Sequence, residues 1–126
     1  MAGILIVEDH KDLREVLKMS LTRRKYTVIE ASNGREAILK FKPEITDLVI
    51  TDIIMPDEDG LKVILKIRQI KPGIKIIAIS GGGKAGPGNY LNVAKALGAD
   101  EVIPKPFSMG TLISKINGLL SNEQPE

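Results

Sequence analysis

The chain contains no cysteine and no tryptophan, and aromatic residues make up only 3% of it. The absence of cysteine excludes disulfides, thiolate nucleophiles and sulfur-ligated zinc. The scarcity of aromatic side chains leaves little for stacking on bases or sugar rings. With 43% hydrophobic residues, the chain must therefore build an aliphatic core.

Long hydrophobic runs are also missing. No apolar stretch approaches the roughly 20 residues that a membrane span needs, and Met1-Ala2-Gly3 carries no basic leader. We therefore expect a cytoplasmic protein that does not associate with a membrane. A length of 126 residues predicts a single domain, over residues 1–121, followed by a polar tail at 122–126.

The net charge is +2, and many of the basic residues fall in two segments, 11–25 and 62–75. Solvated helix faces are the favoured interpretation of this pattern. Nucleic-acid binding is a minor alternative, because the basic residues have no interleaved aromatics and form no recognisable docking motif.

Five short apolar runs alternate with five amphipathic stretches, which predicts an α/β fold with a parallel sheet covered by helices on both faces. Runs without strict alternation are typical of strands that are buried on both faces. The predicted strands are Gly3–Val7, Tyr26–Glu30, Leu48–Thr51, Lys75–Ile79 and Glu101–Ile103.

The amphipathic stretches predict helices whose apolar residues face the sheet. The inward residues expected are Leu13, Val16, Leu17 and Leu21 in the first helix, Ala37, Ile38 and Phe41 in the second, and Leu61, Ile64 and Leu65 in the third. The Ser32-Asn33-Gly34 cluster begins the second helix and Pro43 ends it. A fourth helix is expected at about Asn89 to Leu97, and a fifth from Ser108, a suitable N-cap, to Leu120.

The segment from Gly81 to Gly88 contains five glycines. It does not match the phosphate-binding P-loop, because Gly83-Lys84 is followed by Ala85 instead of serine or threonine. Two interpretations stay open. The segment is either a functional mobile loop or a slack connection that tolerates insertion.

Polar groups follow four of the predicted strands: Glu8-Asp9, Asp52, Ser80 and Lys105. In an open parallel sheet, ligand sites form beyond the carboxyl ends of the strands, so these groups share one edge. Carboxylates and a backbone carbonyl are suitable Mg2+ ligands. We expect Asp9 and Asp52 to bind the ion directly, Glu8 to reach it through water, and the carbonyl of Ile54 to complete the protein side.

An ionised aspartate can attack phosphorus and carry a covalent phosphoryl group. Catalysis of such a transfer is chiefly positioning and charge neutralisation. Lys105 supplies a cation for one phosphoryl oxygen and Ser80 a hydroxyl for another. These groups predict a phosphoacceptor site centred on Asp52.

The chain resembles the receiver domains of two-component response regulators over nearly its whole length. The matching residues are Glu8-Asp9, the run from Asp52 to Gly60, Ser80, Gly98-Ala99-Asp100 and Lys105-Pro106-Phe107. The resemblance implies a flavodoxin-like, doubly wound sheet of five strands in the order 2-1-3-4-5 with five helices. It also implies a cis Lys105-Pro106 bond and a signalling protein rather than a metabolic enzyme.

The resemblance further implies the partners. Asp52 would be phosphorylated with Mg2+ by a sensor histidine kinase or a histidine phosphotransfer protein. We expect a single-domain protein that acts in trans on an unknown protein target. Val102 departs from the family pattern, since many receivers carry at this position an aromatic residue that moves inward on phosphorylation.

Three other functions compete with this one. A binding module could keep the fold without phosphotransfer, although Asp9, Asp52, Ser80 and Lys105 are all retained. A haloacid-dehalogenase-like phosphatase needs a second acid two residues after the nucleophile, where Ile54 stands. A flavodoxin would need a hydroxyl-rich loop after the first strand and aromatic residues to flank a flavin.

Overall fold

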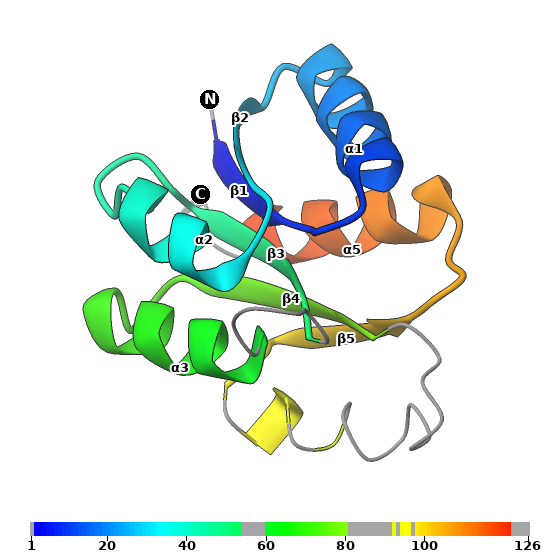
Figure 1. Cartoon of the computed structure of the whole chain (residues 1–126). Coiled ribbons are helices and arrows are strands. Elements are labelled where there is room, and N and C mark those ends of the chain that lie inside the picture. Colours follow the sequence, from blue (N-terminus) through cyan, green and yellow to red (C-terminus); the bar gives the residue numbers. More distant parts are fainter. Residues whose placement is uncertain (1, 54–59, 81–91, 93, 97, 122–126) are drawn as a thin grey trace.

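The computed structural model describes residues 2–53, 60–80, 92, 94–96 and 98–121. Its centre is a five-stranded parallel sheet with the order β2-β1-β3-β4-β5, as the resemblance implies (Figure 1). The strands are β1 (Gly3–Val7), β2 (Thr27–Ala31), β3 (Leu48–Asp52), β4 (Lys75–Ser80) and β5 (Glu101–Pro104). All five predicted strands are therefore confirmed, with boundaries that differ by at most one residue.

Four helices are continuous within the described residues. They are α1 (Lys11–Arg23), α2 (Gly34–Lys40), α3 (Gly60–Ile70) and α5 (Met109–Ser121). Residues 92 and 94–96 are also helical, where the fourth helix is predicted. The rest of that helix, the glycine-rich segment and the 122–126 tail lie outside the described residues. Within the described part of the chain, no helix is both long enough and apolar enough to span a membrane.

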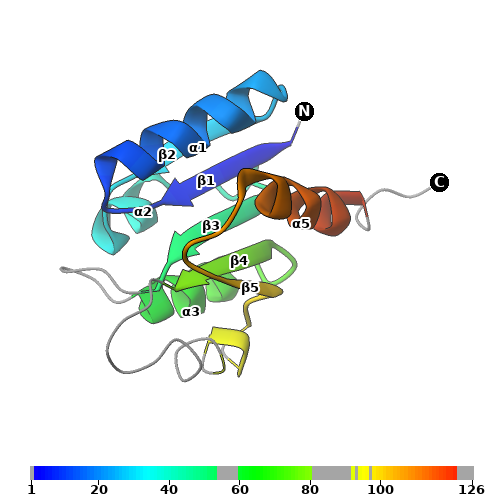
Figure 2. The ribbon, with the colours of Figure 1, turned by 90° about the vertical axis from the view of Figure 1, so that its right-hand side faces the viewer.

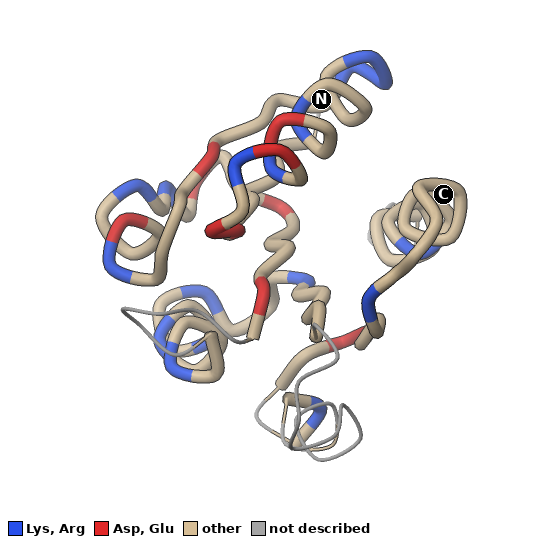
Figure 3. Tube along the Cα trace, turned by 45° about the vertical axis from the view of Figure 1, so that its right-hand side comes forward, with Lys and Arg blue, Asp and Glu red and all other residues tan. Residues whose placement is uncertain are grey.

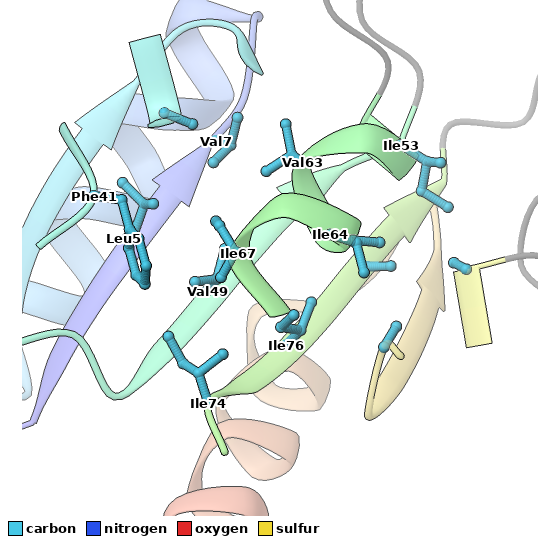
Figure 4. Close-up of a cluster of buried hydrophobic side chains, with 14 of the residues drawn as sticks. Leu5, Val7, Phe41, Val49, Ile53, Val63, Ile64, Ile67, Ile74 and Ile76 are labelled. Carbon is cyan, nitrogen blue, oxygen red and sulfur yellow. The ribbon is translucent and has the colours of Figure 1, made fainter. Parts of the chain in front are cut away.

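The helices cover both faces of the sheet, with α1 and α5 on one side and α2 and α3 on the other (Figure 2). Successive strand residues point to opposite faces. In β1, Ile4 and Ile6 pack with α1 and α5, whereas Leu5 and Val7 pack with α2 and α3 (Figure 4). The residues of β1 and β3 are all buried, as expected for strands with no solvent face.

Two residues predicted to face the core are exposed instead. Val16 is 49% exposed and Leu65 is 44% exposed. The buried residues of α3 are Gly60, Val63, Ile64 and Ile67, a stripe of which Leu65 is not part. Neighbouring helix positions are about 100° apart, so residues beside a narrow apolar stripe turn towards solvent.

Side-chain caps fix two of the helix starts. Asn33 caps α2, since its Oδ1 accepts a hydrogen bond from the Glu36 amide at 2.8 Å. Ser108 precedes α5, and its Oγ accepts from the Thr111 amide at 3.0 Å. Both predicted caps are therefore confirmed. The predicted end of α2 was too late, because the backbone is already extended at Phe41, before Pro43.

Helix α1 ends in a Schellman motif built around a lysine. The Lys25 amide donates to the Thr22 carbonyl at 2.9 Å, and the Tyr26 amide donates to the Leu21 carbonyl at 3.1 Å. Lys25 takes the left-handed conformation, with φ of 72°. Glycine is the usual residue at this position, because a Cβ makes the left-handed region unfavourable.

Replacing Lys25 with glycine should stabilise the fold. Lys25→Gly removes the strained Cβ but gives the unfolded chain more freedom, so we expect a net gain of about 0.5–1 kcal/mol in the free energy of unfolding. Urea denaturation measures this gain. Lys25→Ala is the control, because alanine keeps the Cβ. An equal gain in both variants would mean that removing the lysine side chain beyond Cβ causes the stabilisation. That result would contradict the role of the Cβ in the left-handed conformation.

Candidate functional site

The sheet brings the polar residues at the ends of its strands to one edge. All strands run in the same direction, so their carboxyl ends gather on one side of the molecule (Figure 2). Backbone pairing continues at or beyond these ends: the Glu8 amide donates to the Ala31 carbonyl at 3.0 Å, and the Lys105 amide to the Ser80 carbonyl at 2.8 Å. The backbone of these site residues is therefore held by the sheet.

Lys105 joins the two buried acids of the site. Its Nζ lies 3.0 Å from Asp52 Oδ2 and 3.3 Å from Glu8 Oε1. The Asp52 and Glu8 side chains are only 3% and 1% exposed. A carboxylate removed from water needs a nearby counter-charge, and Lys105 provides it for both acids.

The pKa values show that one lysine does not fully compensate this cluster. Burial raises the pKa of the Glu8 carboxyl, and the negative charge of Asp52 raises it further. Burial alone would lower the pKa of Lys105. Its hydrogen bond to Asp52 and the charges of Asp52 and Glu8 instead raise that pKa above the usual value. The ionised form of Glu8 is therefore disfavoured, and additional positive charge would stabilise the site.

His10 contacts the other side of the acid pair. The His10 amide and Nδ1 each lie 3.1 Å from Glu8 Oε2, and Nδ1 lies 3.4 Å from Asp9 Oδ1. The imidazole is 72% exposed, and His10 is the N-cap residue of α1. Its contacts with both acids were not predicted, and the only sequence clue is that it directly follows them.

Arg14 is a second site residue that the sequence did not reveal. Its guanidinium donates to the backbone carbonyl of Glu8 at 2.8 Å, and its Nε lies 3.6 Å from the Glu30 carboxylate. The arginine therefore connects the end of β1 to α1 and β2. On the sequence it was one of several basic residues in the first helix, with nothing to distinguish it.

Gly60 packs directly against the backbone of Asp52. Its amide donates to the Ile53 carbonyl at 3.0 Å. A Cβ at this position would lie 2.0 Å from the Asp52 carbonyl oxygen, which is a prohibitive overlap. Glycine is therefore required for α3 to begin against the end of β3. The intervening residues 54–59, including the expected carbonyl ligand Ile54, lie outside the described residues.

Ser80 ends β4, which lies between β3, where Asp52 is the last residue, and β5, which Lys105 directly follows. Its side chain is fully buried, and its Oγ has no hydrogen-bond partner among the residues that the structure describes. An unsatisfied buried hydroxyl is unfavourable by itself. Ser80 therefore offers a donor that a ligand at this edge could use.

The acidic residues fit a divalent cation. Glu8, Asp9, His10 and Asp52 each have a ligand atom within 4.8 Å of those of the others. Glu8 Oε1 and Asp9 Oδ1 are buried atoms whose described contacts are the ion pairs with Lys105 and His10, without a further hydrogen bond in the described ranges. Three carboxylates supply the hard oxygen ligands that Mg2+ prefers. The structure thus brings together Glu8, Asp9, Asp52 and Lys105, as predicted from the sequence.

The charged residues outside this cluster are spread over several elements. Figure 3 shows basic positions on each of the described helices, with acidic positions among those of α1 and α2. Some of them form ion pairs, such as Lys18 with Glu30 at 3.0 Å. This distribution agrees with the solvated helix faces predicted from the sequence.

The model of the response regulator receiver domain family matches residues 4–117. The chain belongs to this family. It is 38% identical over 115 residues to the chemotaxis protein CheY of Thermotoga maritima, covering 90% of this chain and 93% of that protein. The cis Lys105-Pro106 bond implied by the resemblance is also present.

Other family members are much longer. The transcriptional regulator NtrC of Azospirillum brasilense is 33% identical over 126 residues, which are 98% of this chain and only 25% of that protein. Among solved structures, the response regulator TrrA of Thermotoga maritima in complex with Mg2+-BeF is 37% identical. Its TM-score is 0.81, and the match covers 94% of this chain and 99% of that one.

Magnesium should stabilise the protein through the acid cluster. At an ion concentration of about 100 times Kd, the free energy of unfolding should rise by about 2.7 kcal/mol. Asp9→Asn removes one ligand and one negative charge, so most of this increase should disappear. Thermal unfolding with EDTA and with Mg2+ measures both effects.

Asp12→Asn is the matched control, because Asp12 is an exposed acid in the first turn of α1. This variant should respond to Mg2+ as the wild type does. An equal Mg2+ response in Asp9→Asn, or none in the wild type, would contradict the assignment of the ion to this cluster.

Proposed function

We propose that the protein is a phosphoacceptor in histidine-to-aspartate signalling and is phosphorylated on Asp52 with Mg2+. The observation that carries the proposal is the contact of the buried Asp52 carboxylate with the Lys105 ammonium, 3.0 Å away, beside a second and a third acid. A purely structural ion pair needs one carboxylate. Three clustered carboxylates, only two of which contact Lys105, leave negative charge that a cation must offset.

The transfer uses the Asp52 carboxylate as the nucleophile. One of its oxygens attacks the phosphorus of a phosphohistidine, a phosphorus–oxygen bond forms, the phosphorus–nitrogen bond breaks, and the donor imidazole leaves with its electron pair. The side chain keeps one oxygen for contact with the cation. The product is an acyl phosphate on Asp52.

Lys105 and Ser80 act on the oxygens of the transferred group. The Lys105 ammonium, which now contacts Asp52 and Glu8, would follow the negative charge to a phosphoryl oxygen. The unpartnered Ser80 hydroxyl would donate to another. When bound, Mg2+ would neutralise charge on the transferring group. Asp9 and Asp52 would hold the ion directly, Glu8 would do so through water, and the carbonyl of Ile54 would complete the ligand set.

The comparison with TrrA supports Mg2+ and a phosphoryl group as the species that this site would bind. That relative was solved with Mg2+-BeF, and a fluoroberyllate group resembles a phosphoryl group in shape and charge. At 37% identity, it is a suitable guide for the ligand class expected here. In this chain, the acid cluster would suit Mg2+, and the unpartnered Ser80 hydroxyl would suit a phosphoryl oxygen.

The proposed donor is a sensor histidine kinase or a histidine phosphotransfer protein. We propose that the phosphorylated protein then acts in trans on a separate protein target. The identity of the target would have to come from binding experiments that compare the two phosphorylation states.

Acetyl phosphate and Mg2+ should phosphorylate the protein once. Intact-mass spectrometry should detect one added phosphoryl group, and reduction of the acyl phosphate followed by peptide mapping should locate it at Asp52. Asp52→Asn should abolish the modification. Lys105→Met should slow it by about 100-fold or more, because the charge in the transition state loses a contact.

Asp12→Asn serves again as the control and should react at the wild-type rate. An unmodified wild type would favour the alternative of a binding module that keeps the fold without phosphotransfer. Modification at another acid with Asp52 unchanged would also contradict the proposal.

A further inference from the structure

His10 brings a nitrogen donor to a cluster that otherwise contains only oxygen ligands. Its ring is largely exposed, yet its Nδ1 faces inwards, towards Glu8 Oε2 at 3.1 Å and Asp9 Oδ1 at 3.4 Å. It is the only histidine of the chain. The imidazole therefore lies where solvent can reach it while it contacts the acids of the site.

The separations between these atoms, which here are those of a hydrogen bond and an ion pair, also fit ligands that share one ion. Two ligand atoms at about 2.1 Å from a metal are about 3.0 Å apart at octahedral angles and about 3.4 Å apart at tetrahedral angles. The two distances from Nδ1 lie within this range.

The lysine does not compete for the same atoms. Lys105 contacts Glu8 Oε1, whereas His10 contacts Glu8 Oε2. Lys105 can therefore stay on Glu8 and Asp52 while an ion binds on the side of His10 and Asp9. Apart from its 3.4 Å contact with His10 Nδ1, the buried Asp9 Oδ1 has no hydrogen-bond partner within the described ranges, so an ion between the two could use it.

We propose that His10 is an additional ligand of this site that raises its affinity for borderline divalent transition metals, such as Co2+ and Zn2+, relative to Mg2+. Imidazole nitrogen suits these ions, whereas Mg2+ is satisfied by oxygen ligands. The proposal extends the metal site of the proposed function but does not require phosphorylation. Because Asp9 serves both kinds of ion, Mg2+ and the transition metal compete.

Metal titrations of the wild type and His10→Asn test this proposal. The asparagine amide can keep a hydrogen bond to Glu8 but is a poor ligand for Co2+. The substitution should weaken the affinity for Co2+ more than the affinity for Mg2+. We expect the fold-loss for Co2+ to be at least about ten times the fold-loss for Mg2+. Asp12→Asn should bind both ions as the wild type does.

Proton NMR gives a second readout that a hydrogen-bonding role would not produce. With a single histidine in the chain, the ring-proton signals have one source. Paramagnetic Co2+ bound to Nδ1 should shift them strongly, and excess Mg2+ should reverse the shift. Ring signals that Co2+ leaves unshifted, or equal losses of Co2+ and Mg2+ affinity in His10→Asn, would overturn the proposal.

The outcome is independent of the phosphoacceptor test. A wild type that acetyl phosphate fails to modify would refute the proposed function, yet the selective Co2+ loss could still be measured. A modified wild type whose His10→Asn variant loses both metals equally would leave the proposed function intact and refute the role of His10.

Discussion

Repulsion among the carboxylates of Glu8, Asp9 and Asp52 is the constraint on which the site depends. These acids have ligand atoms within 4.8 Å of one another, and Glu8 and Asp52 are almost fully buried. Lys105 offsets part of the charge, yet burial and Asp52 still raise the pKa of Glu8. An added cation would therefore stabilise this excess of negative charge, which links the electrostatics of the site to metal binding and to phosphoryl chemistry.

The fold maintains this unfavourable arrangement because the sheet fixes the backbone beneath it. The order β2-β1-β3-β4-β5 makes the strands that end at the acids, Ser80 and Lys105 neighbours. Aliphatic layers cover both faces of these strands. Gly60 completes the support, since only a residue without a Cβ can pack on the Asp52 carbonyl. The energy of the core thus offsets the local cost of the charges.

The sequence predicted the features that depend on pattern and missed those that depend on detailed packing. Apolar runs identified all five strands, and strand ends identified the acids and Lys105. The exposure of Val16 and Leu65 was missed, because apolar character does not define the width of a buried stripe. The contacts of His10 and Arg14 depend on side-chain rotamers across a turn, which residue order does not encode.

The most direct test of this account is a double-mutant cycle between Lys105 and Asp52 in EDTA. Urea denaturation gives the free energy of unfolding of the wild type, Lys105→Met, Asp52→Asn and the double variant. The account predicts that Lys105→Met costs at least about 1 kcal/mol less when Asp52 is already neutral, because contacting charges couple. An equal cost in both backgrounds would contradict it, since Lys105 would then not be compensating the charge of Asp52.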